Sequence, residues 1–196
     1  MAMNCHSHPD MHLPTIRRRA HGLTLLEVMV VAGMIFSLVA LALPSLQEWI
    51  TRWRVQQAVD DLRSTMLLAR TQALRRSGDV FVQKLPGSTP TCTQALAAAS
   101  WDCGWVVFVD ANRNRGWDAG EELQRFVPAA GLSVTRSSAA PTIAIDRWGM
   151  VGAGGSVGFT IAPSPGSRGM QAARDVCIAP GGRIQVAARA PGACSA

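Results

Sequence analysis

The stretch that decides the fold reads GLTLLEVMVVAGMIFSLVALAL and runs from Gly22 to Leu43. Apart from Glu27 it carries no charge, and three consecutive arginines at positions 17–19 precede it. The apolar segment 23–46 is long enough to cross a bilayer as a helix, and a basic flank before such a segment stays in the cytoplasm. A lone carboxylate inside an apolar segment is costly unless another group pairs with it. These features predict a membrane-spanning helix that has an acidic residue near its start.

The residues from Gly22 to Glu27 resemble the processing signal of type IV prepilins and type II secretion pseudopilins. In that family a prepilin peptidase cuts after the glycine and methylates the new amino terminus. The resemblance therefore implies cleavage between Gly22 and Leu23, methylation of Leu23, and pairing of Glu27 with the amino terminus of a neighbouring subunit during assembly. Pro44 stands where many pilins carry a helix-kinking proline. The alternative interpretation is an ordinary signal anchor in which Glu27 is incidental.

An amphipathic helix should continue after the apolar segment. Apolar residues recur at steps of four and three, which is the spacing of one helix face: Val55, Val59, Leu62, Met66, Ala69 and Ala73. Ser77 and Gly78 should end this helix. We therefore expect four parts: a leader at 1–22, a transmembrane and assembly half of the helix at 23–46, an amphipathic half at 47–77, and a globular head at 78–196.

Short apolar runs separated by glycine- and proline-rich segments indicate that the head is rich in β-strands. The strongest runs are Trp105–Val109 and Leu123–Val127. The weaker runs are Val80–Val82, Leu132–Val134, Thr142–Ile145, Val157–Ile161, Val176–Ile178 and Arg183–Val186. The predicted fold class is α+β, with a long amino-terminal helix packed on one antiparallel sheet, and the resemblance makes this a type IV pilin-like fold.

The residue inventory argues against catalysis. All four histidines lie within residues 1–22, so the chain after the expected cut has no histidine to act as a general base. It also lacks a glycine-rich phosphate loop of the Walker type. The formal net charge of +6 is compatible with an anionic partner but does not require one. We expect no enzymatic activity, no cofactor and no catalytic residue.

Four cysteines remain after the expected cut, and an even number in an exported head indicates disulfides. Three pairings are open. The favoured pairing joins Cys92 to Cys103 and Cys177 to Cys194, because each bond then closes a short loop. A zinc site is the rival, but no two of these cysteines have metal-binding C-x-x-C spacing.

The segment from Gly104 to Leu123 resembles the hairpin of the GspH/FimT branch of minor pilins and pseudopilins, with its apolar strand after Gly-Trp and its Asp- and Asn-rich turn. Its polar residues also have calcium-loop spacing: Asp110, Asn112, Asn114, Asp118 and Glu121. However, Arg115 occupies the sixth position, where a calcium loop needs glycine, and strands rather than helices flank the turn. Asx turns that stabilise a tight hairpin are the simpler interpretation. No other metal site is expected.

Gly182-Arg183 resembles the start of a Gly-Arg-x-Arg motif with which competence-type FimT proteins contact DNA. Gln185 replaces the second arginine, and Arg189 is a candidate substitute from a nearby loop. Alternation along 183–186 places Arg183 and Gln185 on one face of a strand and two apolar residues on the other. A solvated polar strand face is the competing interpretation. Any contact to DNA phosphates here would be insensitive to sequence.

The resemblance thus implies a minor pilin of the GspH/FimT type that assembles with other major and minor pilins. Its expected location is the bacterial inner membrane, with a single span and a periplasmic head, and afterwards the pilus or pseudopilus. Two alternatives remain open: a minor pseudopilin of a type II secretion system, and a DNA-binding competence pilin. The expected partners are therefore other pilins or pseudopilins, the prepilin peptidase, the inner membrane and, in the last alternative, DNA.

Overall fold

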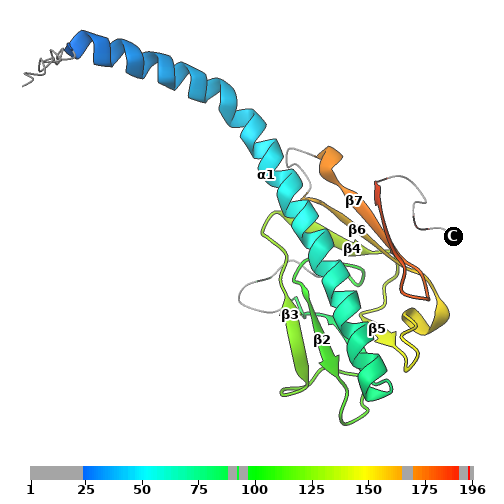
Figure 1. Cartoon of the computed structure of the whole chain (residues 1–196). Coiled ribbons are helices and arrows are strands. Elements are labelled where there is room, and N and C mark those ends of the chain that lie inside the picture. The colour runs from blue at the N-terminus through cyan, green and yellow to red at the C-terminus, as the bar shows by residue number, and fades with distance from the viewer. Residues whose placement is uncertain (1–23, 88–91, 93–96, 165–169, 190–193, 195–196) are drawn as a thin grey trace, which may run out of the picture. The chain divides into compact units, whose positions relative to one another are not determined.

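The computed structural model describes residues 24–87, 92, 97–164, 170–189 and 194. Gly22 and Leu23, the two residues of the expected cleavage site, lie outside this described part. The chain divides into two compact units, Met1–Ala42 and Leu43–Ala196. The first contains the start of the long helix, and the second contains the rest of that helix and all the β-strands (Figure 1).

The helix α1 spans Leu25–Arg76. Thr24 caps its start, because the Thr24 hydroxyl accepts a hydrogen bond from the backbone N–H of Glu27 at 3.3 Å. At the other end Ser77 has a positive φ of 61°, and the Gly78 N–H donates to the Ala73 carbonyl at 2.9 Å. This is the geometry of a Schellman cap. The helix therefore ends at Ser77 and Gly78, as the sequence predicts, with Ser77 rather than the glycine in the first left-handed position.

The membrane-spanning potential of the helix is less clear in the structure than in the sequence. Among the described residues, no single helix is long and apolar enough to cross a membrane. The helical stretches Leu25–Ala40 and Ser45–Arg76 satisfy that requirement by length and composition only when they are taken together.

The strands form two four-stranded antiparallel sheets instead of the single sheet predicted from the sequence. The first sheet has the order β3-β2-β1-β5 and contains β1 (Val80–Lys84), β2 (Trp105–Val109), β3 (Glu122–Phe126) and β5 (Thr142–Ile145). The second has the order β4-β6-β7-β8 and contains β4 (Leu132–Arg136), β6 (Val157–Pro163), β7 (Arg174–Ile178) and β8 (Ile184–Ala188). The chain changes sheet after β3, because β4 pairs with β6 while β5 returns to pair with β1.

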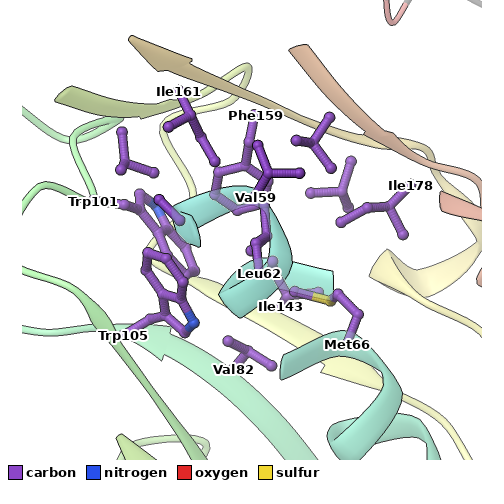
Figure 2. Close-up of a cluster of buried hydrophobic side chains, with 14 of the residues drawn as sticks. Val59, Leu62, Met66, Val82, Trp101, Trp105, Ile143, Phe159, Ile161 and Ile178 are labelled. Carbon is purple, nitrogen blue, oxygen red and sulfur yellow. The ribbon is translucent and has the colours of Figure 1, made fainter. Parts of the chain in front are cut away.

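The core lies between α1 and the inner faces of both sheets. All six apolar residues of the predicted helix face are buried, which confirms the face. Figure 2 shows Val59, Leu62 and Met66 of the helix among side chains from the two sheets and the loop before β2: Val82, Trp101, Trp105, Ile143, Phe159, Ile161 and Ile178. The apolar face of the helix thus packs in one core with residues from both sheets.

One buried hydrogen bond fixes the first sheet to the helix. The Trp105 indole N–H donates to the Thr65 hydroxyl at 2.7 Å, and that hydroxyl donates to the Asp61 carbonyl at 2.7 Å. A buried indole N–H needs such a partner, since an unsatisfied polar group is costly in a core. The bond therefore aligns the start of β2 with the middle of the amphipathic half of α1.

The outer face of the first sheet has a small apolar cluster of its own. It contains Leu85, Cys103, Val106 and Phe108, with Phe81, Cys92 and Trp117 packed against it. Strand β2 is therefore buried on both faces: Trp105 and Val107 face the main core, and Val106 and Phe108 face this second cluster. This double burial explains why β2 is a continuous apolar run rather than an alternating one.

Candidate functional site

The start of α1 carries the side chain that the sequence assigns to assembly. Glu27 is exposed and lies in the first helical turn, three residues after the cap Thr24. An acidic side chain is favourable here, because the helix dipole is positive at this end. Thr24-x-x-Glu27 is also the sequence pattern of a capping box, a second signal for a helix start at this point. The roles of Gly22, Leu23 and Glu27 remain predictions.

The predicted kink at Pro44 also remains a prediction. The backbone at Pro44 belongs to α1, and the side chains of residues 41–44 lie outside the described part of the chain. Proline removes one backbone donor from the helix ladder, which is the physical reason to expect a kink there.

The structure contains both disulfides of the favoured local pairing. Cys92 is bonded to Cys103, and Cys177 is bonded to Cys194, with Cα–Cα separations of 5.4 Å and 5.1 Å. The first closes the loop that leads into β2 and contributes to the outer cluster of the first sheet. The second ties the segment after β8 to β7. This pairing leaves none of the four cysteines free for the rival zinc site.

The turn between β2 and β3 is held by the side chains with calcium-loop spacing. The Asp110 carboxylate accepts the backbone N–H groups of Asn114 and Arg115 at 3.0 and 2.8 Å. The Asn112 and Asn114 side-chain amides both donate to Asp118, at 2.8 and 2.6 Å. Glu121 accepts the N–H groups of Ala111 and Asp118 at 2.9 and 3.3 Å. The carboxylates of Asp110, Asp118 and Glu121 thus all accept hydrogen bonds from backbone N–H groups or side-chain amides of the turn.

This network supports the Asx-turn interpretation. Asn112 and Asn114 each accept a backbone N–H two residues later, at 2.9 and 2.7 Å, which defines an Asx turn. Within the described ranges, no group of three or more His, Cys, Asp or Glu side chains is placed to hold a metal ion. Calcium at this turn therefore stays a prediction that the observed hydrogen bonds do not require.

The turn should loosen at low pH. Hydrogen bonds from Asn112, and then from Asn114, lower the pKa of Asp118 below its ordinary value of 3.8. Because the folded pKa is depressed, the stabilisation is present above pH 3.8 and is lost as the pH falls through the lowered value. The side-chain amide NMR signals of Asn112 and Asn114 should shift together in that range. Asp118→Asn should abolish the shift, and an unchanged titration in this variant would contradict the assignment.

The turn between β7 and β8 carries the Gly-Arg pair. Gly182 has φ +81°, and its N–H donates to the Ala179 carbonyl at 2.8 Å. A Cβ at Gly182 would lie 2.6 Å from the Arg70 guanidinium, which donates to the Gly181 carbonyl at 2.9 Å. The positive φ favours glycine at position 182, whereas the Arg70 guanidinium is the end of a flexible side chain that can move aside. Arg183 is exposed immediately before β8.

A second turn lies against this one, and it was not predicted from the sequence. The Asp146 carboxylate accepts the N–H groups of Trp148 and Met150 at 2.9 and 2.8 Å. The Val151 N–H donates to the Pro180 carbonyl at 2.8 Å, which joins this turn to the β7–β8 turn. Trp148 is 75% exposed. The sequence does contain a signal for this turn, because Asp146 and Gly149 are turn-forming residues on either side of the bulky Trp148.

Arg189 does not lie near Arg183, which corrects the expectation that it substitutes for the missing second arginine. All five residues of β8 separate the two arginines, and six steps of roughly 3.3 Å put them about 20 Å apart. Arg189 lines a different pocket, with Ser133, Pro163 and Met170. The predicted alternation in β8 is confirmed, because Ile184 and Val186 are half-buried while Gln185 is exposed.

Comparison with known proteins gives the family. A family model described as type II transport protein GspH matches residues 58–182, which is more than half of the chain. The chain belongs to the GspH/FimT family of minor pilins and pseudopilins. This GspH-family match covers most of the amphipathic half of α1 and the strands β1 to β7, and it ends in the turn before β8.

One protein sequence and one solved structure resemble this chain, and the solved structure bears on the fold alone. The GspH-family chain is 37% identical over 102 residues to the pilin-like protein PilA1 of Thermus thermophilus. That match covers 52% of this chain and only about half, 56%, of the relative. The crystal structure of the type IV minor pilin FimU from Pseudomonas aeruginosa has a TM-score of 0.50 at 21% identity, covering 67% of this chain and 91% of FimU. The α+β pilin-like fold predicted from the sequence is thereby confirmed.

Proposed function

We propose that this chain is a minor pilin that prepilin peptidase processes and that enters, or primes, a type IV pilus. One observation carries the proposal: the signal from Gly22 to Glu27 runs into the first turn of a helix whose second part is buried against a GspH-family head. The chain would wait in the inner membrane with its head in the periplasm. Its mechanism is then assembly with other pilins, without a chemical step of its own.

The two parts of α1 differ in exposure, and this difference supports the proposal. From Leu25 to Leu38 the large apolar side chains of α1 are exposed, as suits a segment that contacts lipid before assembly and neighbouring helices afterwards. From Val55 to Ala73 one face is buried under both sheets, so any force on the helix reaches the head. Glu27 supplies the selective contact, because a carboxylate within lipid is stable only when it is paired or neutral.

The same features fit a minor pseudopilin of a type II secretion system, and the GspH description of the matching family model favours this alternative. Both systems use the same processing signal and the same pairing by glutamate. They differ in the partners of the head, so the neighbouring genes distinguish them most simply. Other minor pilin genes would indicate a type IV pilus, and a secretion operon would indicate a type II secretion system.

The Glu27→Ala variant tests the assembly proposal. It should insert into the membrane and be cleaved, yet be depleted from sheared filaments at least about tenfold, since a lost pairing of more than about 1.4 kcal/mol has that effect. Glu48→Ala is the matched control, because Glu48 lies on the same helix in an exposed ion pair with Arg52 at 3.7 Å. Quantitative immunoblots of filaments and membranes give the measurement. Normal abundance of the Glu27→Ala variant in filaments would refute the proposal.

DNA binding is a second candidate function, and one observation favours it. Arg183 is exposed on a turn that is joined to the turn of Arg147 and Trp148 by the Val151–Pro180 hydrogen bond. The two arginines could contact phosphates, and an exposed indole can stack on a base. Gln185, in place of a second arginine, predicts weak binding.

Gel-shift titrations of the full chain in detergent test this candidate. Arg183→Gln should weaken binding more than Arg63→Gln, because Arg63 lies on α1 beside Asp60 at 3.7 Å. Gln185→Arg should strengthen binding, and affinity should fall steeply as salt rises. If neither the native chain nor the Gln185→Arg variant shifts DNA at low salt, this second function is excluded.

A further inference from the structure

An exposed apolar face on α1 remains unexplained by the fold of the head. Leu46, Trp49, Ile50 and Trp53 follow helical spacing at steps of three, one and three, and they are 52%, 66%, 41% and 58% exposed. We name these four residues the aromatic stripe. Two tryptophans one helical turn apart present a large apolar area to solvent, and such an area marks a contact with a partner or a membrane.

The aromatic stripe faces away from the head. At about 100° per residue, its mean direction lies roughly opposite that of the buried face that includes Val55, Val59 and Leu62. The head therefore cannot cover the stripe. The face also ends abruptly, because Gln57, Asp60 and Ser64 continue it with polar side chains. The stripe thus begins at Leu46, the last residue of the apolar segment 23–46, and continues for two turns beyond it.

A second uncharged surface lies at the same level of the helix. The Arg54 guanidinium donates to the Ala130 carbonyl at 3.5 Å, which places the connection between β3 and β4 beside α1 at residue 54 (Figure 1). This connection, residues 127–131, reads Val-Pro-Ala-Ala-Gly and carries no charge. Val127 is 63% exposed. The end of the head next to the aromatic stripe therefore also presents apolar groups to its surroundings.

We propose that the aromatic stripe and residues 127–131 rest in the headgroup region of a phospholipid bilayer and set the depth at which the head is held before assembly. This rests on the proposed insertion of the apolar segment. Trp49 and Trp53 lie about 5 Å and 10 Å beyond Leu46 at 1.5 Å per residue. The headgroup region extends about 5–8 Å beyond the hydrocarbon on each side, so the two indoles fall in or at the edge of the layer where tryptophan is enriched.

The chemistry of the stripe favours lipid over a neighbouring helix. Helix–helix contacts in membranes use small residues that let two backbones approach closely, whereas Trp49 and Trp53 are the bulkiest side chains available. An indole has an apolar body and one N–H donor, which suits the boundary between acyl chains and headgroups. In the filament the stripe would leave this layer, so extraction of the subunit would include the loss of these contacts.

Depth-dependent fluorescence quenching tests the proposal. The full chain is reconstituted into vesicles of phosphatidylethanolamine and phosphatidylglycerol whose acyl chains are brominated either near the carboxyl end or near the methyl end. Bromine near the carboxyl end should quench the native chain strongly, and bromine near the methyl end should quench it weakly. The variant Trp49→Phe/Trp53→Phe should lose most of the quenching by the first lipid. Trp148→Phe is the matched control, since Trp148 lies on the head and is even more exposed than Trp49 and Trp53, and it should leave the quenching unchanged.

Two measurements distinguish a failure of the proposed insertion from a failure of the proposed interfacial placement. If the chain does not float with the vesicles in a density gradient, the proposed insertion itself fails. If it floats but the Trp49→Phe/Trp53→Phe variant is quenched as strongly as the native chain, or if quenching is stronger near the methyl end, the interfacial placement is overturned while insertion stands. A photo-crosslinker at Trp49 that labels another subunit instead of lipid in membranes without filaments would also overturn it.

Discussion

Replacing Gly104 with alanine should destabilise the head more than any other single substitution at a glycine of the described chain. Gly104 precedes β2 and has φ +94°. A Cβ there would lie 2.1 Å from the Phe126 carbonyl oxygen and 3.1 Å from the Val127 Cα. These are backbone atoms of the paired strand and the residue after it, so they cannot move aside without displacing β3.

Several further contacts make this position rigid. The Gly104 N–H donates to the Trp101 carbonyl at 2.9 Å, and the Gly104 carbonyl accepts the Leu85 N–H at 2.9 Å. Cys103 and Trp105, on either side, anchor a disulfide and the core. A left-handed conformation costs an alanine about 1–2 kcal/mol, and overpacking adds about 1–3 kcal/mol. The expected loss of about 2–5 kcal/mol is a large fraction of the stability of an ordinary domain.

Gly120→Ala is the matched control. Gly120 has nearly the same φ, +96°, but nothing lies within 4 Å of the position of its Cβ. The stability of this variant should therefore fall only by the conformational cost, about 1–2 kcal/mol. Thermal unfolding of the two variants separates the two effects. Equal losses would show that the close approach to Phe126 is not the cause.

Much of the fold could be predicted because its local patterns are strong. The buried face of α1 follows from spacing alone, and β2 and β5 begin and end at the predicted residues. The other strands differ by one or two residues at one or both ends. The same patterns give the order of the parts, a helix before a β-rich head, and the resemblance to minor pilins added the expectation of a type IV pilin-like fold.

The division into two sheets could not be predicted, because strand pairing is a long-range property. Val82 pairs with Ile143 across about sixty residues, and Val134 pairs with Ile161 in the other sheet. Alternation along a strand indicates which side chains share a face, but it does not name the partner strand. For the same reason the contact between the turns at Asp146 and Gly182 could not be predicted from the sequence. The separation of Arg183 from Arg189 was missed because the predicted strand ended at Val186, whereas β8 continues to Ala188.

The remaining large effect is expected at the processing signal. Gly22→Leu should leave the precursor uncut, because the peptidase needs a small residue beside the scissile bond to reach the backbone. The product in the membrane should retain residues 1–22 and should lack a methylated Leu23. Without a free amino terminus at Leu23, Glu27 of a neighbouring subunit has no partner, so the uncut chain should also be missing from filaments.

Intact-mass spectrometry of the membrane-bound protein decides this prediction. Gly33→Leu is the control, because Gly33 lies exposed in the same helix and, apart from its chain neighbours and the nearby helix backbone, no atom lies within 4 Å of the position that a Cβ would take. The larger residue therefore adds apolar area without strain, and this control should be cut and methylated normally. A Gly22→Leu product with the mass of the cleaved, methylated chain would show that cleavage does not depend on Gly22. If the native chain itself keeps residues 1–22 and carries no methyl group, the segment is an ordinary signal anchor. Such a result would also remove the basis for assigning assembly to Glu27, because the two roles depend on the same cut.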